Sequence, residues 1–370
     1  MPPSFIVPHL PTCLIRRCGP GQFLSLLLLS FLLMGPLAAT AAHAQDAALL
    51  LGYRSPVSIP RPIPYYAGSA DSLARPTYHT ALITSRNGTI STLGDLPGLL
   101  VPRSGGFWRV DTKRSIYNDW VEDFVWSAPL NGTTKFPGIQ AYNGEYCQGH
   151  RTQTINFASP RYLSIEVQTA GYCEDAAHPW TFNTFAVIPI DSTASLGLPI
   201  STVLGDAGQA ALVSAAEEYL SGLPPDERER YLPEPDAASW NVVRKHGHWA
   251  IQGRLDPASV ALSATADFDV ETQIPPALVG ADTLAPGWPR IRAFAPDAVD
   301  AFSSPGGGIL AILHPASLTV HTVTDGEIGP ASLTMKVPQG TRAVMARWAN
   351  GPAIARWMEP FTRSAARSER

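Results

Sequence analysis

The chain has 370 residues, of which 45% are hydrophobic and 16% charged, and its formal net charge is −4. This balance allows a sizeable core and excludes disorder as the dominant state. The acidic balance also argues against a general nucleic-acid-binding protein, which needs a cationic surface. With 35 prolines and 30 glycines, the composition favours short strands joined by many turns.

Residues 1–44 have the layout of a secretory signal peptide. Two arginines precede an apolar run, Phe23–Met34, which a Gly-Pro pair ends. Ala42-His43-Ala44 then offers a cleavage site of small residues before Gln45, so we expect a periplasmic or secreted protein. The alternative is an uncleaved anchor, because Phe23–Ala42 is just long enough to span a bilayer. Contact with a membrane is therefore expected only if the segment is retained.

Residues 45–75 are expected to form a Pro-rich, extended lead-in, since proline removes the N–H that a strand or helix needs. From residue 76 onward the pattern is that of β-structure. Tyr78–Ser85 and the run after Asn87-Gly88 predict a hairpin, because Asn-Gly suits the tight turns that join antiparallel strands. A second hairpin is predicted around the turn at Ser104-Gly105-Gly106.

Trp120–Trp126 is the stretch most suggestive of a binding or catalytic site. Trp120 and Trp126 supply aromatic surfaces beside Glu122 and Asp123, a combination that suits a glycan or peptide ligand. Paired carboxylates also suit general acid and base catalysis. The alternative is that the aromatic rings form the buried face of a strand. Glu122 would then share the apolar face, where a carboxylate needs a partner or a function.

Cys147 and Cys173 are the two cysteines left once the signal segment is removed. An even pair in an exported chain predicts a disulfide bond. The two residues flank β-like runs at 152–157 and 161–168, so the bond would clamp the open end of a hairpin. In the chain-entropy model, closing a loop of this size stabilises the fold by about 3 kcal/mol. The pair supplies too few ligands for a zinc site.

One clear helix is predicted to begin at Asp206. Leu212 and Ala216 share its apolar face, and glycine and proline residues end it. A shorter second helix is expected to follow. A helical insertion at 206–232 therefore interrupts a disulfide-clamped, β-rich domain at 76–260.

The segment Val242–Trp249 resembles Val101–Trp108, because Val, Arg, Gly and Trp recur in step. Two copies can indicate an internal duplication, but we favour two hairpins with similar turn requirements. His246 and His248 share one strand face and could ligate a metal. Two histidines make an incomplete shell, and Gly247 indicates a turn, so no metal site is predicted.

The C-terminal part, residues 261–360, is predicted to be an antiparallel β-meander, followed by a tail at 361–370. Short runs of strand composition alternate there with glycine-containing turns, a spacing typical of a sandwich, a barrel or a propeller blade. The predicted fold class is therefore α+β and dominated by β. It combines a hairpin-rich N-terminal region, a helical insertion and a C-terminal meander that is propeller-like in its spacing.

The sequence contains no nucleophile elbow, P-loop, dinucleotide fingerprint or zinc motif, so it predicts neither a cofactor nor a metal. We expect an exported binding or interaction protein whose partner is an envelope protein or a glycan. A structural envelope component fits the same features. The alternative is an extracytoplasmic hydrolase that cleaves a glycan or peptide through paired carboxylates, with Glu122 or Asp123 acting beside a distant one. Neither the ligand nor the oligomeric state follows from the sequence.

Overall fold

In the computed structural model, the described residues are 46–56, 75–117, 120–132, 147–173, 180–193, 195–259 and 265–368. The described residues belong to one compact unit, His43–Arg370. Residues 1–44, and with them the predicted signal segment, lie outside the described residues. Among the described residues, strands account for 52% and helices for 18%. The predicted β-dominated α+β class is therefore confirmed.

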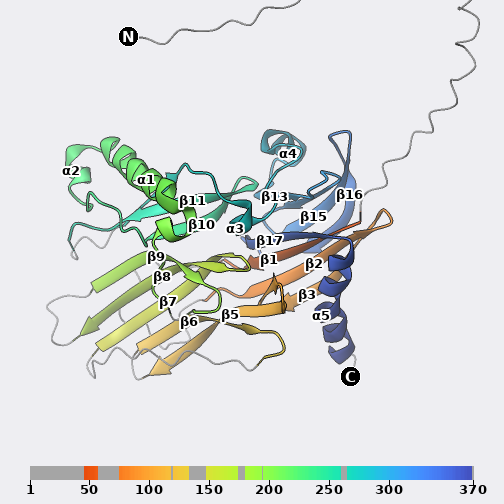
Figure 1. The fold of residues 1–370 in the computed structure, drawn as a ribbon, viewed down its shortest axis with the longest axis horizontal. Helices are drawn as coiled ribbons and strands as arrows, with labels where there is room; N and C mark the ends of the chain where they lie inside the picture. The colour runs from red at the N-terminus through yellow and green to blue at the C-terminus, as the bar shows by residue number, and fades with distance from the viewer. Residues whose placement is uncertain are drawn as a thin grey trace, which may run out of the picture. The chain divides into compact units, whose positions relative to one another are not determined.

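The described strands form four sheets, arranged like the blades of a four-bladed propeller (Figure 1). Sheet I has the order β17-β1-β2-β3, so the last of the described strands pairs with the first. Its strands are β1 (Ala47–Arg54), β2 (Tyr78–Arg86), β3 (Thr89–Pro97) and β17 (Arg342–Asn350). β2 and β3 meet at the predicted turn, where Asn87 and Gly88 have φ of 50° and 77°. Positive φ at both residues is what a type I′ turn requires.

Sheet II has six strands in chain order. They are β4 (Leu99–Arg103), β5 (Gly106–Tyr117), β6 (Trp120–Pro129), β7 (Cys147–Ala158), β8 (Tyr162–Cys173) and β9 (Trp180–Pro189). Neighbouring strands are antiparallel except β6 and β7, which run parallel from the pair Trp120 and Gly149 to the pair Glu122 and Arg151. Beyond these pairs, the Gln153 side chain accepts a hydrogen bond from the Val125 N–H at 2.8 Å. This side-chain hydrogen bond links β6 and β7 beyond the point where their backbone pairing ends.

Sheets III and IV contain the remaining described strands. Sheet III consists of β10 (Trp240–Lys245), β11 (His248–Leu255) and β12 (Ala266–Val270), and sheet IV of β13 (Asp300–Ser303), β14 (Ile309–Leu313), β15 (Ser317–Thr324) and β16 (Glu327–Lys336). The described helices are α1 (Ile200–Ser221), α2 (Pro225–Arg228), α3 (Pro276–Val279), α4 (Trp288–Phe294) and α5 (Pro352–Ser368). β12 pairs with β11, so sheet III crosses the domain boundary predicted at residue 260.

Sheet I packs against sheet II on one face and sheet IV on the other. Ala48 and Leu50 of β1 belong to a core shared with sheet II, whereas Leu49 and Leu51 belong to a core shared with sheet IV. A strand that is buried on both faces has a continuous apolar run rather than alternation. The period-two pattern therefore does not reveal β1, which lies inside the predicted lead-in at 45–75.

A third core joins sheets II and III to α1, which packs over β11 and β12 (Figure 1). Leu212 and Ala216 are fully buried there, as their shared face predicts. Gly253 of β11 permits this approach, because a Cβ at that position would lie 2.6 Å from Leu212 Cδ1. The helix begins at Ile200, earlier than expected, and Gly205 with φ of 71° interrupts it directly before the predicted start.

α5 continues through most of the predicted tail at 361–370, as far as Ser368. Its Ile354 and Phe361 are only 4% and 2% exposed, in the core between sheets I and II. Pro360 lies inside the helix. The sequence does not predict α5, because a proline inside a helical segment normally kinks or ends it.

The two similar hairpins, β4–β5 and β10–β11, differ in register. Val101 lies opposite Trp108 in the first, but Arg244 lies opposite Trp249 in the second, so the turns fall at different points of the matching segments. In both hairpins a guanidinium lies over the Trp ring, with Cζ at 4.5 Å from its centre for Arg103 and 5.2 Å for Arg244. The register favours two independent hairpins with similar needs over matched copies.

Candidate functional site

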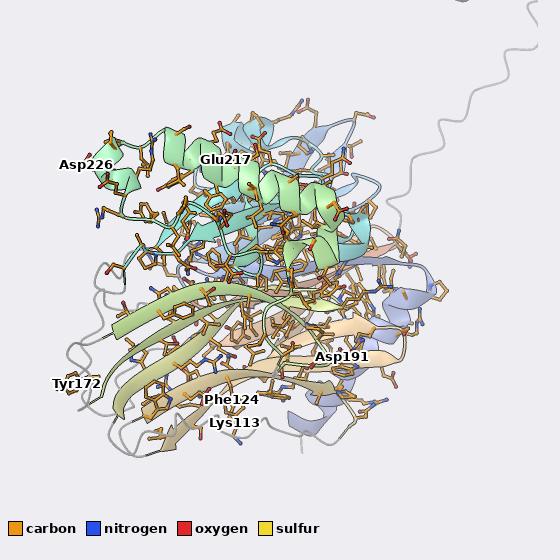
Figure 2. All side chains as sticks on the ribbon, turned by 60° about the vertical axis from the view of Figure 1, so that its left-hand side comes forward. Lys113, Phe124, Tyr172, Asp191, Glu217 and Asp226 are labelled. Carbon is orange, nitrogen blue, oxygen red and sulfur yellow. The ribbon has the colours of Figure 1, made fainter. Side chains whose placement is uncertain are left out.

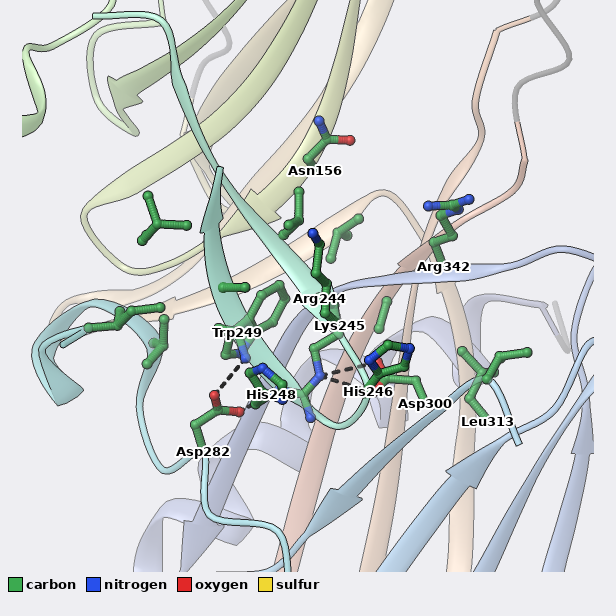
Figure 3. Close-up of a pocket in the computed structure, with 18 of the residues that line it drawn as sticks. Asn156, Arg244, Lys245, His246, His248, Trp249, Asp282, Asp300, Leu313 and Arg342 are labelled. Atoms are coloured by element: carbon green, nitrogen blue, oxygen red, sulfur yellow. Dashed lines mark hydrogen bonds and ion pairs between the residues drawn. The ribbon is translucent and has the colours of Figure 1, made fainter. Parts of the chain in front are cut away.

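A cavity of about 1420 Å³ is lined by residues from all four sheets. Sheet I supplies Arg54 and Arg342, sheet II supplies Asn156, and sheet IV supplies Asp300. Sheet III supplies the largest share through the β10–β11 hairpin, which runs along the cavity in Figure 3. The cavity therefore occupies the place where the four sheets meet, which corresponds to the central channel of a propeller.

The tip of the β10–β11 hairpin is a tight turn at His246 and Gly247. Their φ angles are 48° and 85°, so the turn needs a residue that tolerates the left-handed region, and glycine does so most readily. Gly247 is also confined by its surroundings, because a Cβ there would lie 2.4 Å from Leu284 Cδ2. His246 and His248 both line the cavity, so the histidines noted in the sequence do lie at this site.

Arg244 braces one wall of the cavity. Its Nε donates to both carboxylate oxygens of Asp300 at 3.1 Å, and its Nη1 donates to Asp282. Its Nη2 donates to the carbonyl oxygens of Gly247 at 2.6 Å and Ala301 at 2.7 Å, and the side chain is only 7% exposed. Figure 3 shows Asp282 and Asp300 on either side of the hairpin that carries it. All three nitrogens of this guanidinium donate hydrogen bonds, so it holds sheets III and IV together and is largely committed to the protein.

Arg54 and Arg342 have a different environment. They lie directly opposite each other at the end of the β1–β17 ladder. Nη2 of Arg54 donates to Oδ1 of Asn156 at 3.3 Å, while its buried Nε has no hydrogen-bond partner. Among the described residues, neither arginine has a carboxylate within ion-pair distance. Burial lowers the pKa of Arg54, and the charge of Arg342 lowers it further.

The rest of the lining combines apolar and paired polar side chains. Ile251, Val270 and Ile274 provide apolar surface, and Lys245 forms an ion pair with Asp269. An apolar surface with a few fixed polar groups is typical of small-molecule sites.

The aromatic side chains of the predicted site are mostly buried in β6. Trp120 is 7% and Phe124 8% exposed, and Trp126 is half-buried, with the Arg109 guanidinium 5.9 Å from its ring centre. Figure 2 shows Phe124 beside Lys113, its partner in β5, on the side of sheet II away from α1. This burial agrees with the alternative expectation, in which the aromatic rings form the buried face of a strand.

Glu122 and Asp123 are also buried, at 4% and 2% exposure. Arg114 donates to both oxygens of Asp123 at 2.7 Å, and Arg151 donates to Glu122 at 3.3 Å. Burial raises the pKa of Glu122, although the charge of Arg151 acts in the opposite direction. Adjacent residues of a strand point to opposite faces, so these two carboxylates do not face one substrate bond. In the described structure, the cavity lining includes neither of them and neither tryptophan of the predicted site.

Cys147 and Cys173 lie directly opposite each other in the β7–β8 ladder. Opposed residues of an antiparallel pair have Cα atoms about 5 Å apart, within the range that a disulfide spans. The disulfide itself stays a prediction.

The described residues contain no cluster of metal ligands and no helix suited to a membrane. No group of three or more His, Cys, Asp and Glu side chains is arranged there to hold a metal ion. No helix in the same ranges is long and apolar enough to cross a membrane.

No protein-family model matches the chain, and no curated protein matches it. Among solved structures, a DUF3298 family member from Bacteroides fragilis aligns with 49% of this chain and 96% of its own, at 10% identity and a TM-score of 0.31. A DUF3298 family protein from Pseudomonas aeruginosa aligns with 44% of this chain and 89% of its own, at 12% identity and a TM-score of 0.28. Likenesses this distant assign neither a family nor an activity.

The paired arginines and Asn156 could not be recognised as a group in the sequence. They come from three strands that are far apart in the chain, and each is an unremarkable polar residue in its own segment. The one local signal is that Arg54 ends an otherwise apolar strand, Ala47–Tyr53. A cation in that position needs either a partner or a ligand.

Proposed function

We propose that this is an exported binding protein that takes a small molecule, or a short segment of a larger one, into the central cavity. The observation that supports the proposal is a cavity of about 1420 Å³ lined from all four sheets. Ligand sites commonly have volumes of roughly 300–1,000 Å³, so the space is sufficient for a metabolite, a sugar or a few residues of a peptide.

The construction of the walls also supports binding. Arg244 and its carboxylate partners hold sheet III against sheet IV, and the β10–β11 hairpin has a tight, defined turn. A site on rigid strands loses little conformational entropy when a ligand binds. The cavity is therefore suited to recognition without a large rearrangement.

The proposal includes export of the chain from the cytoplasm. The signal-like segment at residues 1–44 would direct the chain to the periplasm or outside the cell, and the opposed cysteines suit an oxidising compartment. The ligand would then be an envelope component, such as a glycan or part of an envelope protein. Detection of the mature N-terminus at Gln45 in a periplasmic or culture fraction tests this part.

Filling the cavity tests the binding function. Ala250 lines it and is partly exposed, so Ala250→Trp would occupy part of the space. We expect members of a library of metabolites, glycan fragments and short peptides to raise the melting temperature of the wild type but not of this variant. Ala331→Trp is the matched control, because Ala331 is exposed on β16 and is not part of the cavity lining. Hits that stabilise the wild type and both variants equally would exclude the cavity as the binding site.

The hydrolase alternative has one supporting feature, a carboxyl group whose pKa burial raises, as a general acid requires. That feature is Glu122, which has a buried Oε2 without a hydrogen-bond partner. The ion pair with Arg151 and the burial of β6 weigh against the idea. Glu122→Gln and Asp123→Asn variants, assayed on glycan and peptide substrates, test it, and hydrolysis that survives in both would exclude these residues.

A further inference from the structure

We propose that Arg54 and Arg342 form a subsite for an oxyanion, that is, a carboxylate, phosphate or sulfate group of the ligand. This inference rests on the proposed binding function and assigns a chemical class to what is bound. It concerns a small-molecule group and not a nucleic acid.

The two arginines occupy opposed positions in sheet I. They belong to the first and last of the described strands and are directly opposed in an antiparallel pair, which places their Cα atoms about 5 Å apart. Like charges in opposed positions destabilise a sheet. A pairing that costs stability in the free protein is expected where a ligand of opposite charge uses it.

Hydrogen-bond donors around Arg54 are left without acceptors. The Nε of Arg54 is buried and has no partner, which is unusual because buried polar groups are nearly always hydrogen-bonded. Asn156 uses its Oδ1 to accept from Arg54, so its amide nitrogen is left as a donor. Two guanidinium groups and one amide then present only donors, which is the complement of a carboxylate or phosphate.

Ion pairs also shape the distribution of charge in the cavity. The other cations of the lining are already neutralised, Arg244 by Asp282 and Asp300 and Lys245 by Asp269. Glu271 is a further acid of the lining, and no ion pair with it is seen among the described residues. Arg54 and Arg342 are the arginines of the described lining that lie outside these ion pairs.

Among the described residues, no carboxylate forms an ion pair with Arg54. Glu166 is an acid whose charge acts on Arg54, but it is bonded to Arg254 at 3.0 Å. The burial and the neighbouring charge that lower the pKa of Arg54 would both be compensated by a bound anion.

The experiment titrates the mature chain with sodium phosphate, sodium sulfate and sodium succinate by calorimetry at low ionic strength, with glucose as a neutral probe. We expect at least one oxyanion to bind, and Arg342→Gln to weaken that binding by tenfold or more. Arg342→Lys should restore it only partly, because an ammonium cannot make the bidentate contact. Arg290→Gln is the matched control, since Arg290 is an exposed arginine paired with Glu327 outside the cavity, and it should bind as the wild type does.

A second readout separates a binding role from a structural one. Arg342→Gln removes the repulsion between the opposed arginines, so the ligand-free variant should melt at a higher temperature than the wild type. A purely structural arginine would give the opposite result. Arg342 is exposed, so the Arg342→Gln variant is expected to fold. It therefore tests the binding role even if a corresponding Arg54→Gln variant fails to fold.

Different results would exclude the oxyanion subsite and the binding function of the cavity. If neutral ligands bind in a way that Ala250→Trp blocks, but no oxyanion binds, the cavity function stands and the subsite is excluded. Oxyanion binding that Arg342→Gln leaves unchanged also excludes the subsite. If no probe and no library compound binds the wild type, the binding function fails and the subsite fails with it.

Discussion

The Nε of Arg244 lies 3.1 Å from each carboxylate oxygen of Asp300, and both side chains are only 7% exposed. A buried ion pair contributes little net stability, but removing one partner leaves an uncompensated buried charge. We therefore expect Arg244→Gln to lower the free energy of unfolding by about 3 kcal/mol or more, measured by urea denaturation. Lys245→Gln is the control, because its ion pair with Asp269 is largely exposed and should contribute less than about 1 kcal/mol. Equal losses in the two variants would contradict the bracing role of Arg244.

His150 should make the stability of the protein depend on pH. Its side chain is fully buried, and neither ring nitrogen has a hydrogen-bond partner. Burial lowers its pKa from 6.5, although the charge of Asp123 acts in the opposite direction. Below about pH 6.5 the unfolded chain therefore binds a proton that the folded chain does not, so the free energy of unfolding falls as the pH falls.

The measurement for His150 is urea denaturation at pH 7.5 and pH 5. The wild type should lose stability between the two values, and His150→Asn should lose less, because that position no longer titrates. His248→Asn is the control, since His248 is exposed on β11. An unchanged pH dependence in His150→Asn would show that folding does not shift the pKa of this residue, and would contradict the prediction.

The opposition of Cys147 and Cys173 in β7 and β8 leads to a redox prediction. If the disulfide forms, reduction should lower the free energy of unfolding by about 3 kcal/mol, because the unfolded chain regains the entropy of an open loop. The Cys147→Ser and Cys173→Ser double variant should match the reduced wild type and be insensitive to reductant. Alkylation of both thiols in the folded, unreduced protein would show that the bond is absent.

The pairing of β17 with β1 predicts how truncations behave. Deleting residues 351–370 removes α5 and exposes the core that Ile354 and Phe361 cover. At about 1.5–3 kcal/mol for each large buried apolar side chain, the shortened protein should melt at a lower temperature but still cooperatively. Deleting residues 341–370 also removes β17, which contributes to two cores, so cooperative unfolding should disappear. A cooperative transition in the second truncation would show that sheet I does not need its closing strand.

Several local features follow directly from the sequence because short-range chemistry determines them. The Asn87-Gly88 turn forms because these residues tolerate positive φ. Leu212 and Ala216 face a core because a helical period places them on one side. The predicted start of α1 at Asp206 is six residues later than its observed start at Ile200 for a local reason as well. Gly205 interrupts the helix, so the sequence pattern predicts only the part that follows it.

The candidate site is harder to predict from the sequence than these local features are. The hairpin with His246 and His248 is visible in the sequence, and the structure places it in the cavity wall. The aromatic and acidic residues of Trp120–Trp126 attract attention because of their residue types, yet those types also form a buried strand with internal ion pairs. Composition cannot separate these two outcomes, since burial depends on what covers the strand.

The sequence by itself determined the β-dominated class, most of the hairpins and the opposition of the two cysteines, because each depends on side-chain alternation or on turn residues close together in the chain. Only the tertiary structure decided that β17 pairs with β1, that four sheets enclose a cavity, and that Arg54 faces Arg342. Strand pairing over such distances is selected by the burial of whole sheet faces against one another. That free energy belongs to the assembled core, and no short stretch of sequence contains it.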